Sequence, residues 1–157
     1  MSKYYIGTKQ IFAYPEIRGN ERTVDGETVA NPEDGYHVVY SKDTPDEYHS
    51  WSPKDVFEAA YQPLDAMSFG HALVMLKQGK RVARAGWNGR IGGKVMFIFL
   101  VPGSTFKVNR PPLLGIYPEG TEINYHAHID LRTVDGTIVP WLASQTDMLA
   151  EDYCIVE

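Results

Sequence analysis

The sequence predicts an α+β fold: a small, mostly antiparallel sheet with short helices, preceded by an N-terminal α+β extension. Short runs of β-branched and aromatic residues alternate with turns rich in Gly, Pro and Asn, as in antiparallel sheets. Three segments carry helix-start signals, and each is short. With 157 residues, of which 43 % are apolar and 22 % charged, the chain is long enough to bury a core without disulfides or metals.

The first 66 residues are predicted to form one α+β module of unknown role. Strands are expected over residues 4–14 and 36–40, where β-branched and aromatic side chains gather. Between them, Pro15–Asp34 is rich in Gly, Asn, Pro and charge, and it is predicted to be a long loop.

A helix is expected to follow over residues 56–61. Ser52 is the predicted N-cap, Pro53 the first helical residue, and Asp55 a carboxylate that faces the free amides of the first turn. Residues 62–66 have the composition of a linker, so a second module is expected over residues 67–157.

The second module is predicted to open with an amphipathic helix. Ser68 is its N-cap, the apolar residues Phe69, Leu73 and Leu76 follow at helical spacing, and Gly79 ends it. The strand expected at Lys94–Val101 is apolar on both faces, which indicates the centre of a sheet. The other expected elements are a strand at 81–84, a turn at 86–89, an irregular loop at 109–120, a hairpin of 123–132 with 137–141 around Asp135-Gly136, a helical turn at Ser144–Asp147 and a strand at 153–156.

Charge is distributed unevenly along the chain. Residues 1–65 hold 12 acidic and 6 basic side chains, residues 66–118 hold none and 8, and residues 119–157 hold 8 and 1. The net charge of −5 argues against a nucleic-acid polymer as partner and favours a small anion at a local basic site. The alternative is that the basic residues pair with the acidic flanks or face solvent. They are Lys77, Lys80, Arg81, Arg84, Arg90, Lys94, Lys107 and Arg110.

Several classes of protein are disfavoured by composition. Cys154 is the single cysteine, so no intrachain disulfide can form, and a reducing cytoplasm is the expected compartment. The longest apolar run, Val95–Val101, is far shorter than the roughly 20 residues that span a bilayer. The N-terminus lacks the apolar core of a signal peptide, and we expect neither a membrane partner nor a cofactor.

His126, His128 and Asp130 form the most enzyme-like pattern. Alternation along a strand puts these side chains on one face, as a metal site would need. A metal-dependent phosphodiesterase is therefore one hypothesis. The alternative, which we favour, is that the three side chains form the solvent face of a hairpin whose other face carries Tyr125, Ala127, Ile129 and Leu131.

The turn at Gly86-Trp87-Asn88-Gly89, preceded by Arg84, is the best candidate for binding a ligand. An indole can stack on a base, a guanidinium can bind phosphate in a bidentate way, and an asparagine can read a base edge or a ribose hydroxyl. The alternatives are a tryptophan that folds back onto the core, or one that contributes to a protein interface in a non-enzymatic adaptor.

Polar residues after Trp141 form a second candidate group. Ser144, Asp147 and Asp152 have the residue types of helix caps and helix surface, but the carboxylates can also accept from a ribose hydroxyl or an adenine amine. No serine has the surroundings of a nucleophile elbow, so we predict no catalytic residue and no enzyme.

Two long blocks of this sequence resemble the Thoeris anti-defence protein 2 family of small phage proteins. The first runs from Met67-Ser68-Phe69-Gly70 through Lys80-Arg81-Val82-Ala83-Arg84-Ala85-Gly86-Trp87-Asn88-Gly89 to Met96-Phe97. The second runs from Gly136-Thr137-Ile138-Val139-Pro140-Trp141 to Asp152-Tyr153, with Tyr153 where the family pattern has tryptophan. The resemblance covers about residues 67–157.

The resemblance implies a protein that binds and does not cut. Members of that family form homotetramers that sequester cyclic ADP-ribose isomers made by bacterial TIR-domain immune enzymes, and some also take up cyclic dinucleotides. It implies that Trp87 stacks on a base with Arg84 and Asn88 beside it, that Asp147 and Asp152 contact a ribose or a base, and that the protein acts in the cytoplasm of the infected host. We place Ser144 of the same polar group in this ligand site as well.

Overall fold

A computed structural model describes residues 3–4, 6–24, 27–87 and 96–156. The chain divides into two compact units, Met1–Gln62 and Pro63–Glu157. Strands dominate both units, helices are short, and every ladder between named strands is antiparallel, so the predicted α+β class is confirmed. None of the helices in the described residues is long and apolar enough to cross a membrane.

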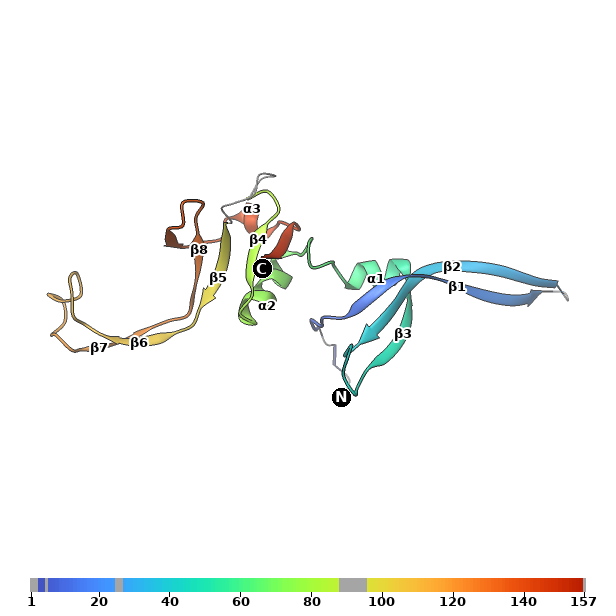
Figure 1. The fold of residues 1–157 in the computed structure, drawn as a ribbon, viewed down its shortest axis with the longest axis horizontal. Helices are drawn as coiled ribbons and strands as arrows, with labels where there is room; N and C mark the ends of the chain where they lie inside the picture. Colours follow the sequence, from blue (N-terminus) through green and yellow to red (C-terminus); the bar gives the residue numbers. More distant parts are fainter. Residues whose placement is uncertain (1–2, 5, 25–26, 88–95, 157) are drawn as a thin grey trace. The chain divides into compact units, whose positions relative to one another are not determined.

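The first unit is a three-stranded antiparallel sheet with one helix (Figure 1). Its strands lie in the order β1 (Phe12–Val24), β2 (Glu27–Tyr40) and β3 (Tyr48–Pro53), and α1 (Lys54–Ala60) follows directly. The helix packs on one face of the sheet through Phe57, which stacks on Tyr36 with ring centroids 4.1 Å apart.

The predicted loop at Pro15–Asp34 is wrong. β1 and β2 pair along their whole length, from Phe12 opposite Val39 to Val24 opposite Glu27. The segment suggested a loop because it is rich in Gly, Asn, Pro and charge, and proline in particular cannot donate to a ladder. The sheet tolerates both prolines: Pro15 lies on edge strand β1, and Pro32 lies beyond the part of β2 that pairs with β3.

Two further boundaries in this unit differ from prediction. The strand expected from residue 4 begins only at Phe12. Ser52 is not the N-cap of α1, because it belongs to β3 and pairs with Tyr36; Pro53 occupies the cap position without a side-chain hydrogen bond. Asp55 does lie in the first helical turn, as predicted.

Gly35 gives the first testable prediction. A Cβ atom at this position would clash with the Ser52 carbonyl oxygen and the Trp51 indole. We therefore expect Gly35→Ala to lower the free energy of unfolding of the first unit by about 1–3 kcal/mol. Gly19→Ala is the matched control, because nothing lies within 4 Å of its Cβ position on the same hairpin. Hydrogen exchange of the β2 and β3 amides measures both; equal protection in the two variants would contradict the prediction.

The second unit contains a five-stranded antiparallel sheet covered by α2 (Phe69–Lys77), with α3 (Gln145–Met148) near one end of β4. The strand order is β10 (Tyr153–Val156), β4 (Arg81–Arg84), β5 (Phe97–Val101), β8 (His128–Arg132) and β9 (Ile138–Pro140). A separate two-stranded ribbon pairs β6 (Ser104–Lys107) with β7 (Glu122–Tyr125) (Figure 1).

Several predictions for this unit are confirmed. Ser68 caps α2 by accepting from the His71 backbone N–H, and Gly79 follows the helix with a φ of +80°. β5 is the central strand, as its apolar faces predicted, although residues 94–95 of the expected strand lie outside the described residues.

The continuous strand predicted at residues 123–132 is wrong in one respect. The chain leaves the extended ladder at His126 and Ala127, so β7 pairs with β6 and β8 pairs with β5 and β9. Sequence alternation continues through the break, which is why it predicted one strand. The predicted pairing with the following strand is confirmed for Asp130–Arg132.

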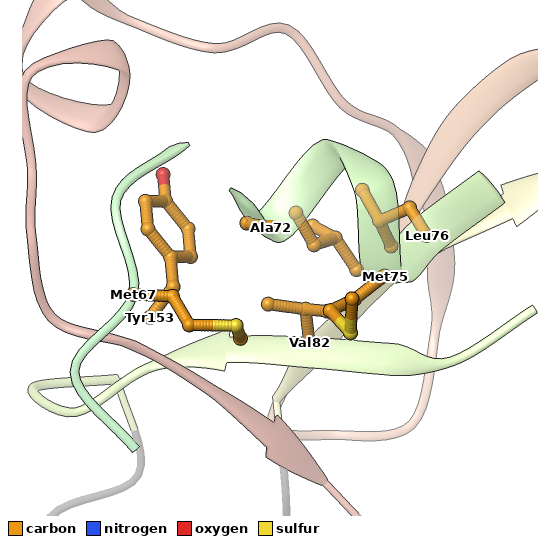
Figure 2. Packing of buried hydrophobic residues seen from close by; sticks show 7 residues of the cluster. Met67, Ala72, Met75, Leu76, Val82 and Tyr153 are labelled. Carbon is orange, nitrogen blue, oxygen red and sulfur yellow. The ribbon is translucent and has the colours of Figure 1, made fainter. Parts of the chain in front are cut away.

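The core of the second unit lies between α2 and the sheet (Figure 2). Ala72 and Leu76 of the helix face Val82 of β4, and Met67 joins β10 through two backbone hydrogen bonds with Tyr153. Tyr153 and Met67 are both fully buried, so β10 and the first residue of the family-like sequence belong to one core.

Candidate ligand-binding site

Four of the six predicted site residues meet at one end of β4. The Arg84 side chain donates from Nε to Asp152 Oδ1 at 2.9 Å and from Nη1 to Asp147 Oδ1 at 3.2 Å. These pairs join residues more than 60 positions apart in the sequence. The antiparallel register that places Arg84 opposite Tyr153 brings them together.

Ser144, the N-cap residue of α3, holds the Asp147 carboxylate in place. Its hydroxyl accepts from the Asp147 backbone N–H, while Asp147 Oδ2 accepts from the Ser144 backbone N–H at 3.0 Å and hydroxyl at 2.7 Å. This reciprocal capping box fixes the first turn of a helix too short to be stable alone. Asp147 therefore accepts hydrogen bonds from Ser144 with one carboxylate oxygen and from Arg84 with the other.

The electrostatics of this group follow from these contacts. Burial alone would raise the pKa of Asp147, but hydrogen bonds from Ser144 and the charge of Arg84 outweigh it and lower that pKa. The pKa of Arg84 is raised, chiefly by its hydrogen bond to Asp152. Two carboxylates and one guanidinium give the three side chains a formal net charge of −1. Arg84 is thus paired with acidic residues of the C-terminal flank, which was one of the alternatives for the basic segment.

Tyr153 anchors this site to the core. Its hydroxyl donates to the Asp147 carbonyl oxygen at 2.8 Å, which ties α3 to β10. Burial, followed by the negative charge of Asp147, raises the pKa of Tyr153 to about 12.

That shift predicts an alkaline loss of stability. Folded Tyr153 holds its phenolic proton more tightly than the unfolded chain does, in which tyrosine has a pKa of about 10. This stability is present below about pH 10 and is lost as pH rises toward about 12. We expect Tyr153→Phe to cost about 1 kcal/mol at neutral pH and to reduce the alkaline loss. Denaturant unfolding of the second unit at pH 7 and 11 tests this against exposed Tyr125→Phe; equal alkaline losses would contradict it.

Trp87 lies three residues after Arg84, in the turn that follows β4. Its backbone N–H donates to the Arg84 carbonyl oxygen at 3.0 Å. The indole is half-buried and packs against the core, so the alternative in which this tryptophan folds back onto the core holds for part of its surface. Its ring meets Trp141 edge-on, with centroids 6.2 Å apart.

Trp141 is a candidate site residue that the sequence reasoning did not select. It contacts both Trp87 and Phe69, and its backbone N–H donates to Ile129. Its position directly after Pro140 in the second family-like block was an available signal. Asn88, the remaining predicted site residue, lies outside the described residues.

The predicted metal pattern does not assemble in the described residues. No group of three or more His, Cys, Asp or Glu side chains there is placed to hold a metal ion. His126 precedes β8 and is exposed, whereas His128 Nε2 lies 3.5 Å from Asp130 Oδ1, an atom that is buried without a hydrogen-bond partner. Asp130 is thus less exposed than the solvent-face interpretation predicted.

The four residues predicted on the apolar face of that hairpin differ in burial. Ile129 and Leu131 pack against the core, as predicted. Tyr125 and Ala127 are exposed instead, because the chain breaks from the ladder between β7 and β8.

The second unit is therefore a small α+β domain with a polar cluster at the end of β4 and, in the turn that follows this strand, a tryptophan that contacts Trp141. Residues 67–156 match the family model of the Thoeris anti-defense 2-like domain, which covers more than half of the chain. The chain belongs to this anti-defence family. It is 43 % identical over 90 residues to Thoeris anti-defense 2 of Bacillus phage SP01, an alignment covering 57 % of this chain and 94 % of that relative.

Proposed function

We propose that this protein binds and sequesters a cyclic nucleotide immune signal, a cyclic ADP-ribose isomer, without cleaving it. The observation that carries the proposal is the Arg84–Asp147–Asp152 cluster at the end of β4, inside the family domain, where the Trp87 backbone N–H donates to the Arg84 carbonyl oxygen. The proposed setting is the cytoplasm of an infected bacterium, where TIR-domain enzymes make such signals.

Each side chain has a role that its contacts support. Trp87 stacks on the adenine, and the edge-on contact with Trp141 orients its ring. Asp147 and Asp152 accept hydrogen bonds from ribose hydroxyls or from the adenine amine. Arg84 acts as a positioning residue, because two carboxylates already engage its guanidinium.

The protonation of Asp147 fits a residue that holds the ligand and does not act as a general acid. A carboxyl whose pKa is lowered is ionised at neutral pH, so Asp147 accepts hydrogen bonds but has no proton to give a leaving group. A general acid needs the opposite shift.

The proposal includes a homotetramer in which neighbouring subunits cover the site. Leu142 and Leu149, on either side of α3, are 91 % and 81 % exposed, and Met148 is 47 % exposed. Apolar side chains grouped in this way are typical of interaction surfaces. A pocket closed by a second subunit would also exclude water from the ligand.

A retention experiment tests the function. The protein is incubated with a TIR-generated cyclic ADP-ribose isomer, filtered, heated and filtered again, with mass spectrometry on both filtrates. We expect intact ligand only after heating. Altered product would indicate an enzyme, and free ligand in the first filtrate would contradict sequestration of this isomer. A parallel incubation with a cyclic dinucleotide tests the second ligand class.

A further inference from the structure

The segment before β1 is strand-like in sequence and exposed in the structure. Lys3, Tyr4 and residues 6–11 are described, and none of them belongs to a helix or pairs with a strand. Tyr4 and Ile6 are fully exposed. Aromatic and β-branched residues favour strands, and large apolar side chains left uncovered are typical of a surface that a partner covers.

The register of β1 with β2 explains why this segment stays outside the sheet. Phe12 is opposite Val39, so Ile11 would face Tyr40, which is the last residue of β2. At Ser41 the chain turns, with a φ of +50°. Residues before Ile11 therefore have no β2 residue opposite them, and they need the edge of another strand to form a ladder.

β3 presents the least protected edge for such a ladder. Natural edge strands are usually protected by charged residues or proline. β3 forms one edge of the three-stranded sheet (Figure 1), and its residues 48–52 include no Pro, Lys, Arg, Asp or Glu. β1, at the other edge, carries Pro15, Glu16 and Arg18. In the second unit, Met67 already pairs with edge strand β10, and edge strand β9 has three residues, one of them proline.

The side chains of the segment and of this edge match as well. Tyr48, at the start of β3, is 64 % exposed. It lies opposite Tyr40 and, because side chains alternate along a strand, on the sheet face of Tyr36, which α1 contacts. In an added strand Tyr4 and Ile6 would likewise share one face. Placed on the α1 side of β3 they would cover Tyr48, and aromatic and β-branched pairs on neighbouring strands stabilise a sheet.

We propose that this segment of one chain adds as a strand to the β3 edge of a second copy, and that the exchange is reciprocal. In the single chain the segment and its own β3 edge are both available, yet Tyr4 and Ile6 stay fully exposed, so the segment does not add to its own sheet. The β3 edge of another copy offers the same backbone groups, and a reciprocal exchange closes a two-fold symmetric pair.

The contact gives the N-terminal module a role, that of linking copies of the chain. All of the residues involved lie outside residues 67–156, so this contact does not depend on the nucleotide site.

Hydrogen exchange of the full chain tests whether the segment forms a strand. We expect the most protected amide among residues 6–8 to exchange at least about tenfold more slowly than in an unstructured peptide. Ile6→Asp should abolish this protection, because aspartate disfavours strands and cannot pack on Tyr48. The control Ile6→Val keeps a β-branched apolar side chain and should keep the protection. Wild-type amides that exchange as in an unstructured peptide, or protection that persists in Ile6→Asp, would overturn the proposal.

Disulfide cross-linking identifies the partner. A Cys154→Ser background removes the single native cysteine. Ile6→Cys is then combined with Tyr48→Cys or with Ser50→Cys, two β3 positions on the α1 face. We expect at least one pair to give a disulfide-linked dimer on a denaturing gel. Ile6→Cys with Val56→Cys is the matched control, since Val56 is 61 % exposed on α1, and it should stay monomeric. An internal disulfide within one chain, or no cross-link at either β3 position, would overturn the proposal.

Discussion

Replacing Trp87 with alanine is expected to weaken retention of a cyclic ADP-ribose isomer about 10- to 100-fold, because stacking on one base contributes roughly 1–3 kcal/mol. Trp87 also packs against the core, so the substitution should destabilise the second unit as well. Trp87→Phe separates the two effects, since a phenyl ring keeps much of the packing and part of the stacking surface. We expect it to retain more ligand than the alanine variant and to unfold at nearly the wild-type temperature.

Trp51→Phe is the matched control for this experiment. Trp51 belongs to β3 of the first unit, outside the family domain, and its substitution should leave retention unchanged. The measurement is the amount of intact ligand that heat releases after buffer exchange. Wild-type retention by folded Trp87→Ala would contradict the stacking role.

Arg84→Met is expected to produce the second large effect. It removes the cation between two carboxylates and leaves Asp147, whose side chain is only 17 % exposed, without its charge partner. Because the guanidinium is partly solvated, we expect a loss of about 1–2 kcal/mol, between the values for surface and buried pairs. Retention should fall at least about tenfold, since the acceptors lose their positions.

The pH dependence separates this effect from a general packing defect. Asp147 has a lowered pKa in the folded state, so it contributes stability above the pH at which aspartate titrates in the unfolded chain, and this contribution is lost as pH falls through the folded pKa. The difference between wild type and Arg84→Met should therefore narrow below about pH 4. The control is Arg110→Met, which removes an exposed arginine of the same unit. A gap in unfolding free energy that is constant from pH 7 to 3 would contradict the electrostatic account.

Local signals predicted much of the second unit from the sequence. Ser68 and Ser144 both cap helices because each precedes a short helical run with free amides to satisfy. The apolar run ending at Val101 predicted the central strand, and β5 does lie between β4 and β8 with Ile98 fully buried. These features depend on residues close in sequence.

Features that depend on distant residues could not be predicted in this way. Arg84 and Asp152 meet through the register of β4 with β10, which no local pattern encodes. The composition of residues 15–34, including Pro15 and Pro32, indicated a loop. Whether a strand accepts a proline depends on which of its edges is unpaired, and that is set by distant residues. The role of Trp141 likewise emerges only when β9 brings it to Trp87.

The most direct test uses the three tryptophans of the chain, which give three indole N–H signals in a nitrogen–proton correlation spectrum. Adding a cyclic ADP-ribose isomer to the labelled full chain should shift the signals of Trp87 and Trp141 and leave that of Trp51 in place. A shift of Trp51 alone, or unchanged Trp87 and Trp141 signals when the ligand is bound, would contradict the proposed site.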